Sequence, residues 1–323
     1  MKPGLLLPPA DVMDPLGIAT TAERLGYGSV WLPELWGSDA FVQLGLVARE
    51  TESVTLGTAI TNVFSRSPAN IAMAAATVDR YSDGRACLGT GVSTPKVISD
   101  LHGREYDRPV RRAHETIELV KAYLADDEEP VSYDGQLFEV SDFDGLGADV
   151  PVYHAALGPA NRRVVGRVAD GWIPHMLPFS ELAPAFETIR ETATEADRDP
   201  GEITVAPYVP AAVSGDSEAA RNAIRGHVAH YVGSGEGYRN AVARRFPEEA
   251  ETIASLWQSG DRDDARAAVT DEMVADLGVA GTPDEASARL AKLQDGIAEL
   301  PIVTVPKTAT DMALETIDAL APE

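Results

Sequence analysis

Cysteine, lysine and long apolar runs are all scarce in this chain of 323 residues. The single cysteine, Cys87, excludes an internal disulfide, and its place in an apolar stretch predicts a buried, unreactive thiol rather than a nucleophile. No apolar run approaches the roughly 20 residues that a membrane-spanning helix needs. The first residues also lack the small-residue cleavage pattern of a secretory signal. We therefore expect a cytoplasmic protein with no membrane partner.

Positive charge is scarce as well, because 51 acidic residues face 27 basic ones and the net charge is −24. Nucleic acid and anionic lipid are bound by clustered lysine and arginine, so this composition argues against both partners. Only five of the basic residues are lysines. Acidic, lysine-poor surfaces are typical of proteins that work in concentrated salt, where the Debye length falls to about 3 Å at 1 M. The composition predicts a halophile's cytosol, with an ordinary acidic enzyme as the alternative.

Short apolar segments alternate with longer helical patterns along the whole chain. In the helical patterns apolar residues recur every three to four positions, as on one face of a helix. Eight strand-plus-helix units of this kind favour a closed parallel (β/α)8 barrel, the TIM barrel of the α/β class, as a single domain over residues 1–323. The expected strands lie in residues 2–9, 29–34, 54–62, 86–92, 150–157, 171–176, 203–213 and 300–306.

Two segments interrupt this repeat and are expected to be insertions. Residues 126–149, after the fourth strand, alternate around Asp134 and Gly135, which is the signature of a β-hairpin. Residues 235–280, after the seventh strand, are strongly charged and have helical periodicity. Both segments fall between units of the repeat, so we place them in loops of the barrel.

The sequence GTGVS at residues 89–93 raises the question of phosphate binding. A Gly-x-Gly after a strand begins the dinucleotide-binding fingerprint, but that pattern needs a third glycine where this chain has Thr94. Gly158 offers a different anion site. A strand ends and a helix begins there, so free N–H groups and the helix dipole attract negative charge. A plain turn residue is the alternative at Gly158.

Residues 56–93, LGTAITNVFSRSPANIAMAAATVDRYSDGRACLGTGVS, resemble the third and fourth units of the bacterial-luciferase-like superfamily. The likeness is to its branch that uses the deazaflavin coenzyme F420 and includes methylenetetrahydromethanopterin reductase. Residues 22–34, 155–173 and 279–290 are similar to the same family, so the resemblance spans most of the chain. It implies coenzyme F420, with FMN as the alternative cofactor, and a small-molecule substrate. Relatives commonly dimerise through their first helices, which implies a homodimer.

The resemblance also implies where the cofactor lies. In relatives the third strand ends in a bulge, often with a non-prolyl cis peptide, that supports the middle ring of the cofactor, and by position this bulge falls at Ala59 and Ile60. Thr61 and Asn62 are implied at the polar edge of the ring. The other implied contacts follow the cofactor or meet its phosphate: Gly89, Thr90, Gly91, Ser93, Leu157, Gly158 and Pro159.

The catalytic residues are less clear, because three positions that hold an acid or a base in relatives are apolar here. These positions are Leu6, Leu35 and Val92. A sugar-phosphate dehydrogenase is therefore disfavoured. Glu34 beside Trp36 is a candidate proton donor, since an aromatic neighbour can keep a carboxyl protonated, and a structural carboxylate is the equal alternative. His175, at a strand end, is a candidate contact to cofactor or substrate, with a structural histidine as the alternative.

Histidines elsewhere show no metal-ligand spacing with a carboxylate, so we predict no metal site. They lie on expected loops or helices and receive no role: His102, His114, His227 and His230. Three functions remain open. The first is an F420-dependent oxidoreductase that transfers hydride to or from an organic substrate, with a methylene-tetrahydropterin or folate one-carbon reductase as its specific form. The second is an FMN-dependent monooxygenase, and the third is a non-catalytic barrel that binds the cofactor.

Overall fold

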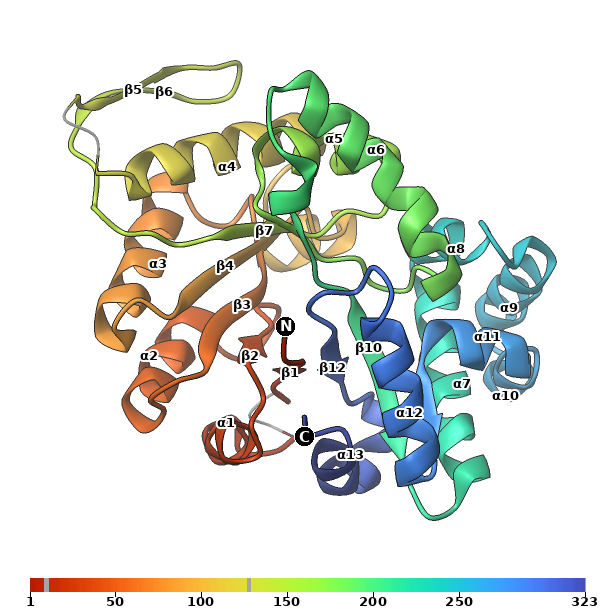
Figure 1. Ribbon diagram of the computed structural model, residues 1–323. Coiled ribbons are helices and arrows are strands. Elements are labelled where there is room, and N and C mark those ends of the chain that lie inside the picture. Colours follow the sequence, from red (N-terminus) through yellow and green to blue (C-terminus); the bar gives the residue numbers. More distant parts are fainter. Residues whose placement is uncertain (9–11, 127–128, 323) are drawn as a thin grey trace.

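A curled parallel sheet of ten strands lies at the centre of the protein (Figure 1). The computed structural model describes residues 1–8, 12–126 and 129–322. Within the sheet the strands follow the order β11-β10-β12-β1-β2-β3-β4-β7-β8-β9. Their bounds are β1 (Gly4–Leu6), β2 (Ser29–Leu32), β3 (Thr55–Asn62), β4 (Ala86–Gly91), β7 (Val152–His154), β8 (Gly171–Trp172), β9 (Thr204–Val205), β10 (Tyr208–Val213), β11 (Val279–Gly281) and β12 (Ile302–Thr304).

Backbone hydrogen bonds also join β9, the last strand in this order, and the residues that follow it to the chain around β12. Leu300 N donates to Val205 O at 3.1 Å, and Ile302 N donates to Pro207 O at 2.8 Å. The run formed by β9 and β10 therefore pairs with β8 on one side and with β12 on the other. It is interrupted at Pro207, whose nitrogen has no hydrogen to donate. The predicted α/β class and parallel sheet are confirmed.

Helices surround the outer face of the sheet (Figure 1). α4 illustrates why: Ala113, Ile117, Val120 and Leu124 recur on one face of the helix and are all buried. The α-helices are α1 (Pro15–Arg24), α2 (Ala40–Glu50), α3 (Pro68–Ser82), α4 (Pro109–Leu124), α5 (Pro159–Val168), α6 (Leu182–Glu195), α7 (Ser217–Ser234), α8 (Glu236–Val242), α9 (Pro247–Ser259), α10 (Arg262–Ala267), α11 (Asp271–Leu277), α12 (Pro283–Gln294) and α13 (Ala313–Ala319). Shorter helical turns are η1 (Val97–Leu101), η2 (Phe179–Glu181), η3 (Pro200–Glu202) and η4 (Lys307–Met312).

All eight segments predicted to be strands contain one. Pro9, in the first of them, lies outside the described residues. The hairpin predicted around Asp134 and Gly135 is present, with β5 (Val131–Asp134) antiparallel to β6 (Glu139–Phe143). The helical character predicted for residues 235–280 is confirmed by α8 to α11. The sequence did not predict β11, which pairs with the end of β10.

Aromatic rings packed over glycines fill the inside of the sheet. Trp31 of β2 and Tyr153 of β7 stack with their ring centroids 5.9 Å apart. A Cβ atom at Gly57 would lie 2.1 Å from the Trp31 ring, and one at Gly171 would lie 2.5 Å from the Tyr153 ring, so only glycine fits beside either ring. Cys87 belongs to the same interior cluster, and burial raises the pKa of its thiol. The expected buried cysteine is confirmed.

A cavity of about 460 Å³ lies where β7, β8 and β9 begin. Its polar groups have partners: Asp170 accepts hydrogen bonds from Lys121 Nζ at 2.6 Å and from Val152 N at 2.9 Å. In α/β barrels this end of the strands serves stability, and the loops that follow the strands carry the chemistry. The functional site is therefore expected at the other end, in the loops that follow the strands.

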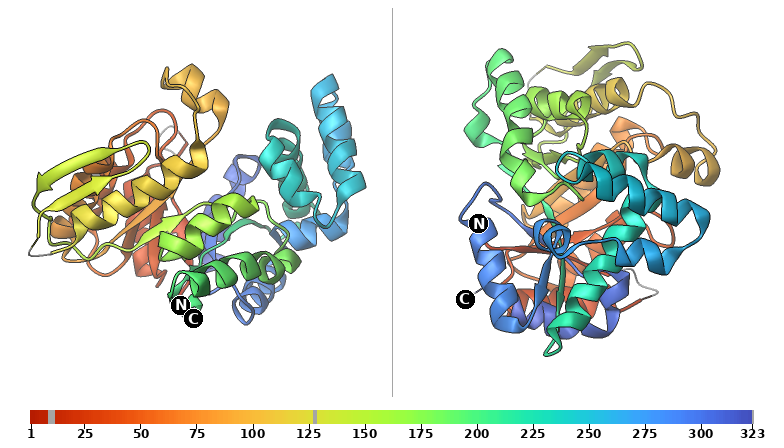
Figure 2. Two further views of the ribbon diagram at one scale, coloured as in Figure 1. Left: turned by 90° about the horizontal axis from the view of Figure 1, so that it is seen from above. Right: turned by 90° about the vertical axis from the view of Figure 1, so that its right-hand side faces the viewer.

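Figure 2 shows which side of the sheet those loops occupy. η1 and helices α8 to α10 project from the same side, while the two termini lie on the opposite side. η1 follows β4 and the helices follow β10, so the projecting side is the one at which strands end. No helix among the described residues is long and apolar enough to cross a membrane.

Candidate functional site

A bulge interrupts β3 between Thr58 and Thr61, where its register against β4 shifts. Gly89 packs directly against this bulge, since a Cβ atom there would lie 2.1 Å from Thr58 O. Thr58 Oγ1 also accepts a hydrogen bond from Gly89 N at 2.8 Å. The expected bulge is confirmed, but the described residues contain no cis peptide bond. The close contact with β3 therefore explains why residue 89 is glycine, without any role for a ligand.

The residues expected around the cofactor ring divide into buried and accessible ones. Thr61 and Thr90 face each other in register and are fully buried. Thr90 Oγ1 donates to Tyr153 O at 3.0 Å. Asn62 Oδ1 accepts from the backbone N–H groups of the two loop residues 64 and 65, so this side chain shapes the turn after β3. Thr61 Oγ1 is buried and has no hydrogen-bond partner among the described residues, whereas Asn62 is occupied by this turn and by His102, whose Nε2 lies 3.4 Å from Asn62 Nδ2.

The accessible residues follow β3 and β4. Ile60, in the bulge, is partly exposed, and a Cβ atom at Gly91 would lie 2.6 Å from its side chain. Ala59 is buried in the interior cluster. Ser93 is partly exposed and has a left-handed backbone with φ of 57°. A flat ligand at this edge would therefore meet backbone and small apolar groups.

Glu34 is tied into an ion pair. Arg66 donates to Glu34 from Nε at 3.1 Å and from Nη2 at 3.0 Å, and it also donates to Asp39 at 2.5 Å. Such two-point contact with arginine is the geometry of a structural carboxylate. Trp36 is 80% exposed and does not shield Glu34 from solvent. The contacts thus favour the structural alternative for Glu34.

Positive charge gathers where α5 begins, directly after β7. Gly158 is exposed, and the N–H groups of the first turn that follow Pro159 receive no side-chain cap within the described part of the chain. Arg162, one turn further on, is only 4% exposed, and its Nε and Nη1 have no hydrogen-bond partner among the described residues. Burial, together with the neighbouring Arg244 and Arg163, lowers the pKa of Arg162. A buried, unpaired guanidinium beside an open helix N-terminus is suited to bind an anion.

A second group of polar side chains lies between the end of β8, the beginning of β10 and the helices α7 and α8. We name it the His–Tyr cluster, and its members are His175, Tyr208, His227, Tyr231 and Tyr238. The His175 ring lies at its centre, with centroid distances of 4.5 Å to Tyr231, 5.3 Å to Tyr208, 5.5 Å to Tyr238 and 5.7 Å to His227. Tyr208 also packs in the interior of the sheet, so the cluster adjoins the sheet's open end.

Several buried polar atoms of the His–Tyr cluster make no hydrogen bond. His175 Nε2, Tyr208 OH and His227 Nε2 are buried and have no partner among the described residues. Burial lowers the pKa of His175 to about 3. Burial, with the His175 and His230 imidazoles nearby, holds the pKa of His227 well below its usual value. Burial raises the pKa of Tyr208 well above its usual value. The cluster is therefore uncharged at neutral pH.

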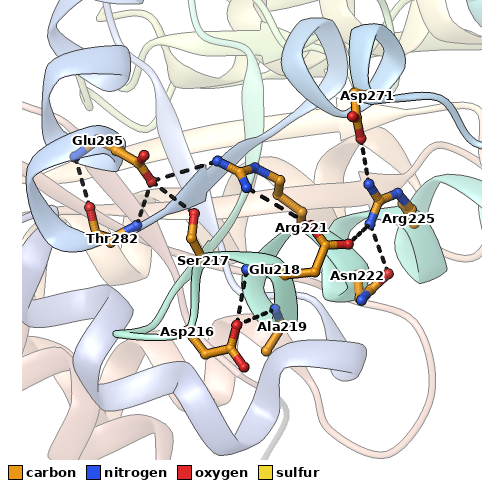
Figure 3. Close-up of polar contacts among 10 residues, drawn as sticks. All are labelled: Asp216, Ser217, Glu218, Ala219, Arg221, Asn222, Arg225, Asp271, Thr282 and Glu285. Atoms are coloured by element: carbon orange, nitrogen blue, oxygen red, sulfur yellow. Dashed lines mark hydrogen bonds and ion pairs between the residues drawn. The ribbon is translucent and has the colours of Figure 1, made fainter.

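An ion-pair network at the start of α7 holds this helix in place (Figure 3). Arg225 donates to Glu218 on the same helix at 2.7 Å and pairs with Asp271 of α11. Arg221 lies 3.8 Å from Glu285 of α12, whose carboxylate also completes the capping box of that helix. The network fixes α7 against two neighbours, and the next turn of α7 carries two members of the His–Tyr cluster.

A curled parallel sheet with a bulged β3 and helices on its outer face defines a protein of the α/β class. Residues 4–300 match the luciferase-like monooxygenase family, and the chain belongs to that family.

Particular relatives extend this assignment. The 5,10-methylenetetrahydromethanopterin reductase of Methanolobus tindarius is 29% identical over 293 residues, which cover 87% of each chain. The solved structure of the coenzyme F420-dependent tetrahydromethanopterin reductase of Methanopyrus kandleri superimposes with a TM-score of 0.81 and 25% identity over 100% of this chain and 97% of that one. An F420-dependent secondary alcohol dehydrogenase, solved with an F420–acetone adduct, has the same fold with a TM-score of 0.76 and 21% identity over the whole of both chains.

Most of the His–Tyr cluster was not predicted from the sequence. His175 was proposed from its place at a strand end, whereas His227 was assigned no role because it lies on a helix. One signal was available: His227 and Tyr231 are four residues apart and share a helix face. Tyr208 and Tyr238 gave no local signal, because their neighbours come from distant parts of the chain.

Proposed function

We propose that this protein is a coenzyme F420-dependent oxidoreductase that transfers hydride between the deazaflavin and an organic substrate. The observation that carries the proposal is the unpartnered Arg162 guanidinium beside the open N-terminus of α5. The nearby Arg244 is paired with Glu181 at 2.8 Å, whereas Arg162 has no comparable counter-ion. A phosphate group would supply the missing negative charge, and F420-dependent enzymes are among the relatives of the chain.

The residues present fit such a cofactor. Gly158 and the first N–H groups of α5, with Arg162, would hold the phosphate. By the resemblance, the β3 bulge at Ala59 and Ile60, with Gly91 at the end of β4 and Ser93 after it, would lie along the ring system, and Ile60 and Ser93 are the partly exposed members of this set. When bound, the deazaflavin supplies the hydride chemistry, and the protein supplies position, electrostatics and exclusion of water. Leu157 and Pro159 flank the phosphate position, and their side chains carry no polar group.

The nature of the substrate is part of the same proposal. Similarity to methylenetetrahydromethanopterin reductase makes a one-carbon unit carried by a pterin or folate the first substrate to test. Leu6 at the end of β1 is apolar, so a proton must come from another residue or from water. Glu34 is engaged with Arg66, which leaves the His–Tyr cluster, beside the end of β8 and the beginning of β10, as a group of polar side chains to consider.

We also propose that the sheet is an eight-stranded (β/α)8 barrel formed by residues 1–323 as one domain. The hydrogen bonds from Leu300 and Ile302 to the β9–β10 run support closure. On this proposal β11 is an added edge strand, and residues 126–149 and 235–280 are insertions that contain the hairpin and helices α8 to α11.

A homodimer is the proposed assembly. Neighbouring helices α2 and α3 expose apolar side chains that a monomer has no reason to keep in water. Val42 and Leu46 on α2 are 65% and 58% exposed, and Met73 on α3 is 48% exposed. Sedimentation of the wild-type chain and of a Leu46→Glu variant tests this assembly, with the variant expected to be a monomer.

The cofactor is tested by titrating the protein with oxidised F420 and with FMN in parallel, in multi-molar potassium chloride, and following fluorescence. We expect tight binding of F420 alone. Arg162→Met should weaken binding by more than tenfold, whereas Arg167→Met, an exposed arginine in the last turn of α5, should leave it unchanged. Tight binding of FMN alone would assign the protein to the monooxygenases, and binding of neither would refute the cofactor proposal.

A further inference from the structure

We propose that the His–Tyr cluster binds an uncharged carbonyl or hydroxyl group of the substrate. This inference rests on the proposed function, because it names the part of the protein that recognises the organic partner in the hydride transfer. It concerns a group of residues that includes one histidine absent from our sequence-based site, His227.

The first support is that three buried polar atoms of the cluster have no hydrogen-bond partner among the described residues. Burying a polar group without a partner is costly, so three such atoms in one cluster require a compensating contact. A neutral imidazole Nε2 donates or accepts according to its tautomer, and a phenol does both. His175, His227 and Tyr208 can therefore hydrogen-bond to a carbonyl oxygen, which only accepts, or to a hydroxyl, which also donates.

The second support is the absence of charge. The pKa values of His175, Tyr208 and His227 are shifted by burial and by neighbouring histidines and tyrosines, and no carboxylate, lysine or arginine of the described residues contributes to these shifts. The cations Arg262 and Lys307 act on His230, which lies on the exposed side of α7. An anion would need protonated histidines to bind here, and the buried imidazoles of the cluster resist protonation. The geometry therefore favours a neutral ligand over a phosphate or carboxylate.

The third support concerns the ring orientations. The His175 ring meets Tyr231 at 73° and Tyr238 at 70°, and these two tyrosines meet each other at 85°. Their faces are thus covered by the edges of neighbouring rings, whereas a cation-binding cage needs free faces. A quaternary ammonium ligand is disfavoured for that reason. His175, Tyr231 and Tyr238 are partly exposed, so a ligand would reach the cluster through these three residues.

The position of the cluster suits a substrate. Tyr208 begins β10 and packs in the sheet interior, and three strands separate β10 from the bulged β3. A substrate group held by Tyr208 and His227 therefore lies across the curled sheet from the proposed ring site. The network of Arg221 and Arg225 in Figure 3 keeps α7 in the orientation that this contact requires.

The experiment uses three probes of similar shape and different charge: acetophenone, benzoate and phenyltrimethylammonium. The full-length protein, labelled with 13C in its six histidines, is titrated with each probe while the histidine ring signals are followed by NMR. His175→Gln and His227→Gln assign the two signals. We expect acetophenone to shift both signals with saturation. Tyr208→Phe should weaken its binding roughly three- to tenfold, as for one lost hydrogen bond. The control His230→Gln should bind like the wild type.

Three results would overturn the inference. Benzoate that binds and protonates both histidines would make the cluster an anion site, and preferential binding of phenyltrimethylammonium would make it a cation site. Failure of acetophenone to bind the folded wild-type protein would leave the cluster without a ligand role. Because no cofactor is present in this titration, its outcome is separate from the F420 measurement. Acetophenone binding without F420 binding would refute only the cofactor, and the reverse would refute only this inference.

Discussion

Replacing Tyr208 with phenylalanine should make the protein more stable. Tyr208 is 6% exposed, and its OH is buried with no hydrogen-bond partner in the part of the chain that the structure describes. Leaving such a group unsatisfied costs about 1–3 kcal/mol, and phenylalanine keeps the ring while removing the group. An unfolding entropy of roughly 2.1 cal/mol/K per residue makes 1 kcal/mol equivalent to about 1.5 °C in Tm for a chain of 323 residues. We therefore expect Tyr208→Phe to raise Tm by about 1.5 to 4.5 °C.

A matched control removes the same atom where its hydrogen bond is made. Tyr27 is 3% exposed, and its OH donates to Ile317 O at 2.9 Å. Tyr27→Phe should lower the free energy of unfolding by about 0.5–1.5 kcal/mol, so the two identical changes should have opposite signs. Calorimetry of both variants and the wild type, without ligand and in the same buffer, measures the difference. If Tyr208→Phe destabilises the protein as much as Tyr27→Phe, the OH of Tyr208 has a partner and the reasoning about the cluster is wrong.

Four further results are expected. Arg162→Met should abolish the rise in Tm that inorganic phosphate gives the wild type, as thermal scans with and without phosphate will show, because the variant lacks the unpaired cation. Burial lowers the pKa of His154 to about 4. Below about pH 6.5 this imidazole is therefore protonated in the unfolded chain, whereas it stays neutral in the folded chain down to about pH 4. Stability measured by urea unfolding should therefore fall between pH 6.5 and 4, by about 3 kcal/mol for this one residue. Cys87 should react with a thiol reagent only after unfolding, since burial raises its pKa; a fast reaction of the native protein would contradict its placement. Tm should rise between 0.1 and 1 M potassium chloride as self-repulsion is screened from a Debye length of about 10 Å to about 3 Å, and an unchanged Tm would remove the argument for a halophilic protein.

Patterns local in sequence predicted the strands well. β3 and β4 were found because an apolar, β-branched run is bounded by turn residues, and the hairpin was found because alternation surrounds Asp134 and Gly135. β11 was missed because three residues are too few to show alternation, and the strand exists only through pairing with the end of β10. Resemblance placed the bulge in β3, which the register shift confirms.

The site was harder to predict, because its partners are distant in sequence. Glu34 was a candidate proton donor until its pairing with Arg66 was known, and these residues are 32 positions apart with no local signal to connect them. Gly89 was expected to make room for a cofactor, but the close approach of β3 already requires a glycine there. Sequence patterns thus identify the loops that bear the chemistry, whereas each side chain's freedom to act depends on contacts that only the fold reveals.

The stacked rings of Trp31 and Tyr153 form a layer in the interior of the sheet, in the same apolar cluster as Tyr208. Gly57 and Gly171 each pack against one of these rings, so a larger residue at either position would collide with a ring. Tyr231 and Tyr238 pack against a different apolar cluster. Substitutions at these two positions can then alter which molecule is accepted without disturbing the layer of Trp31 and Tyr153. A lineage with this arrangement is free to exchange one substrate for another while its scaffold stays constant.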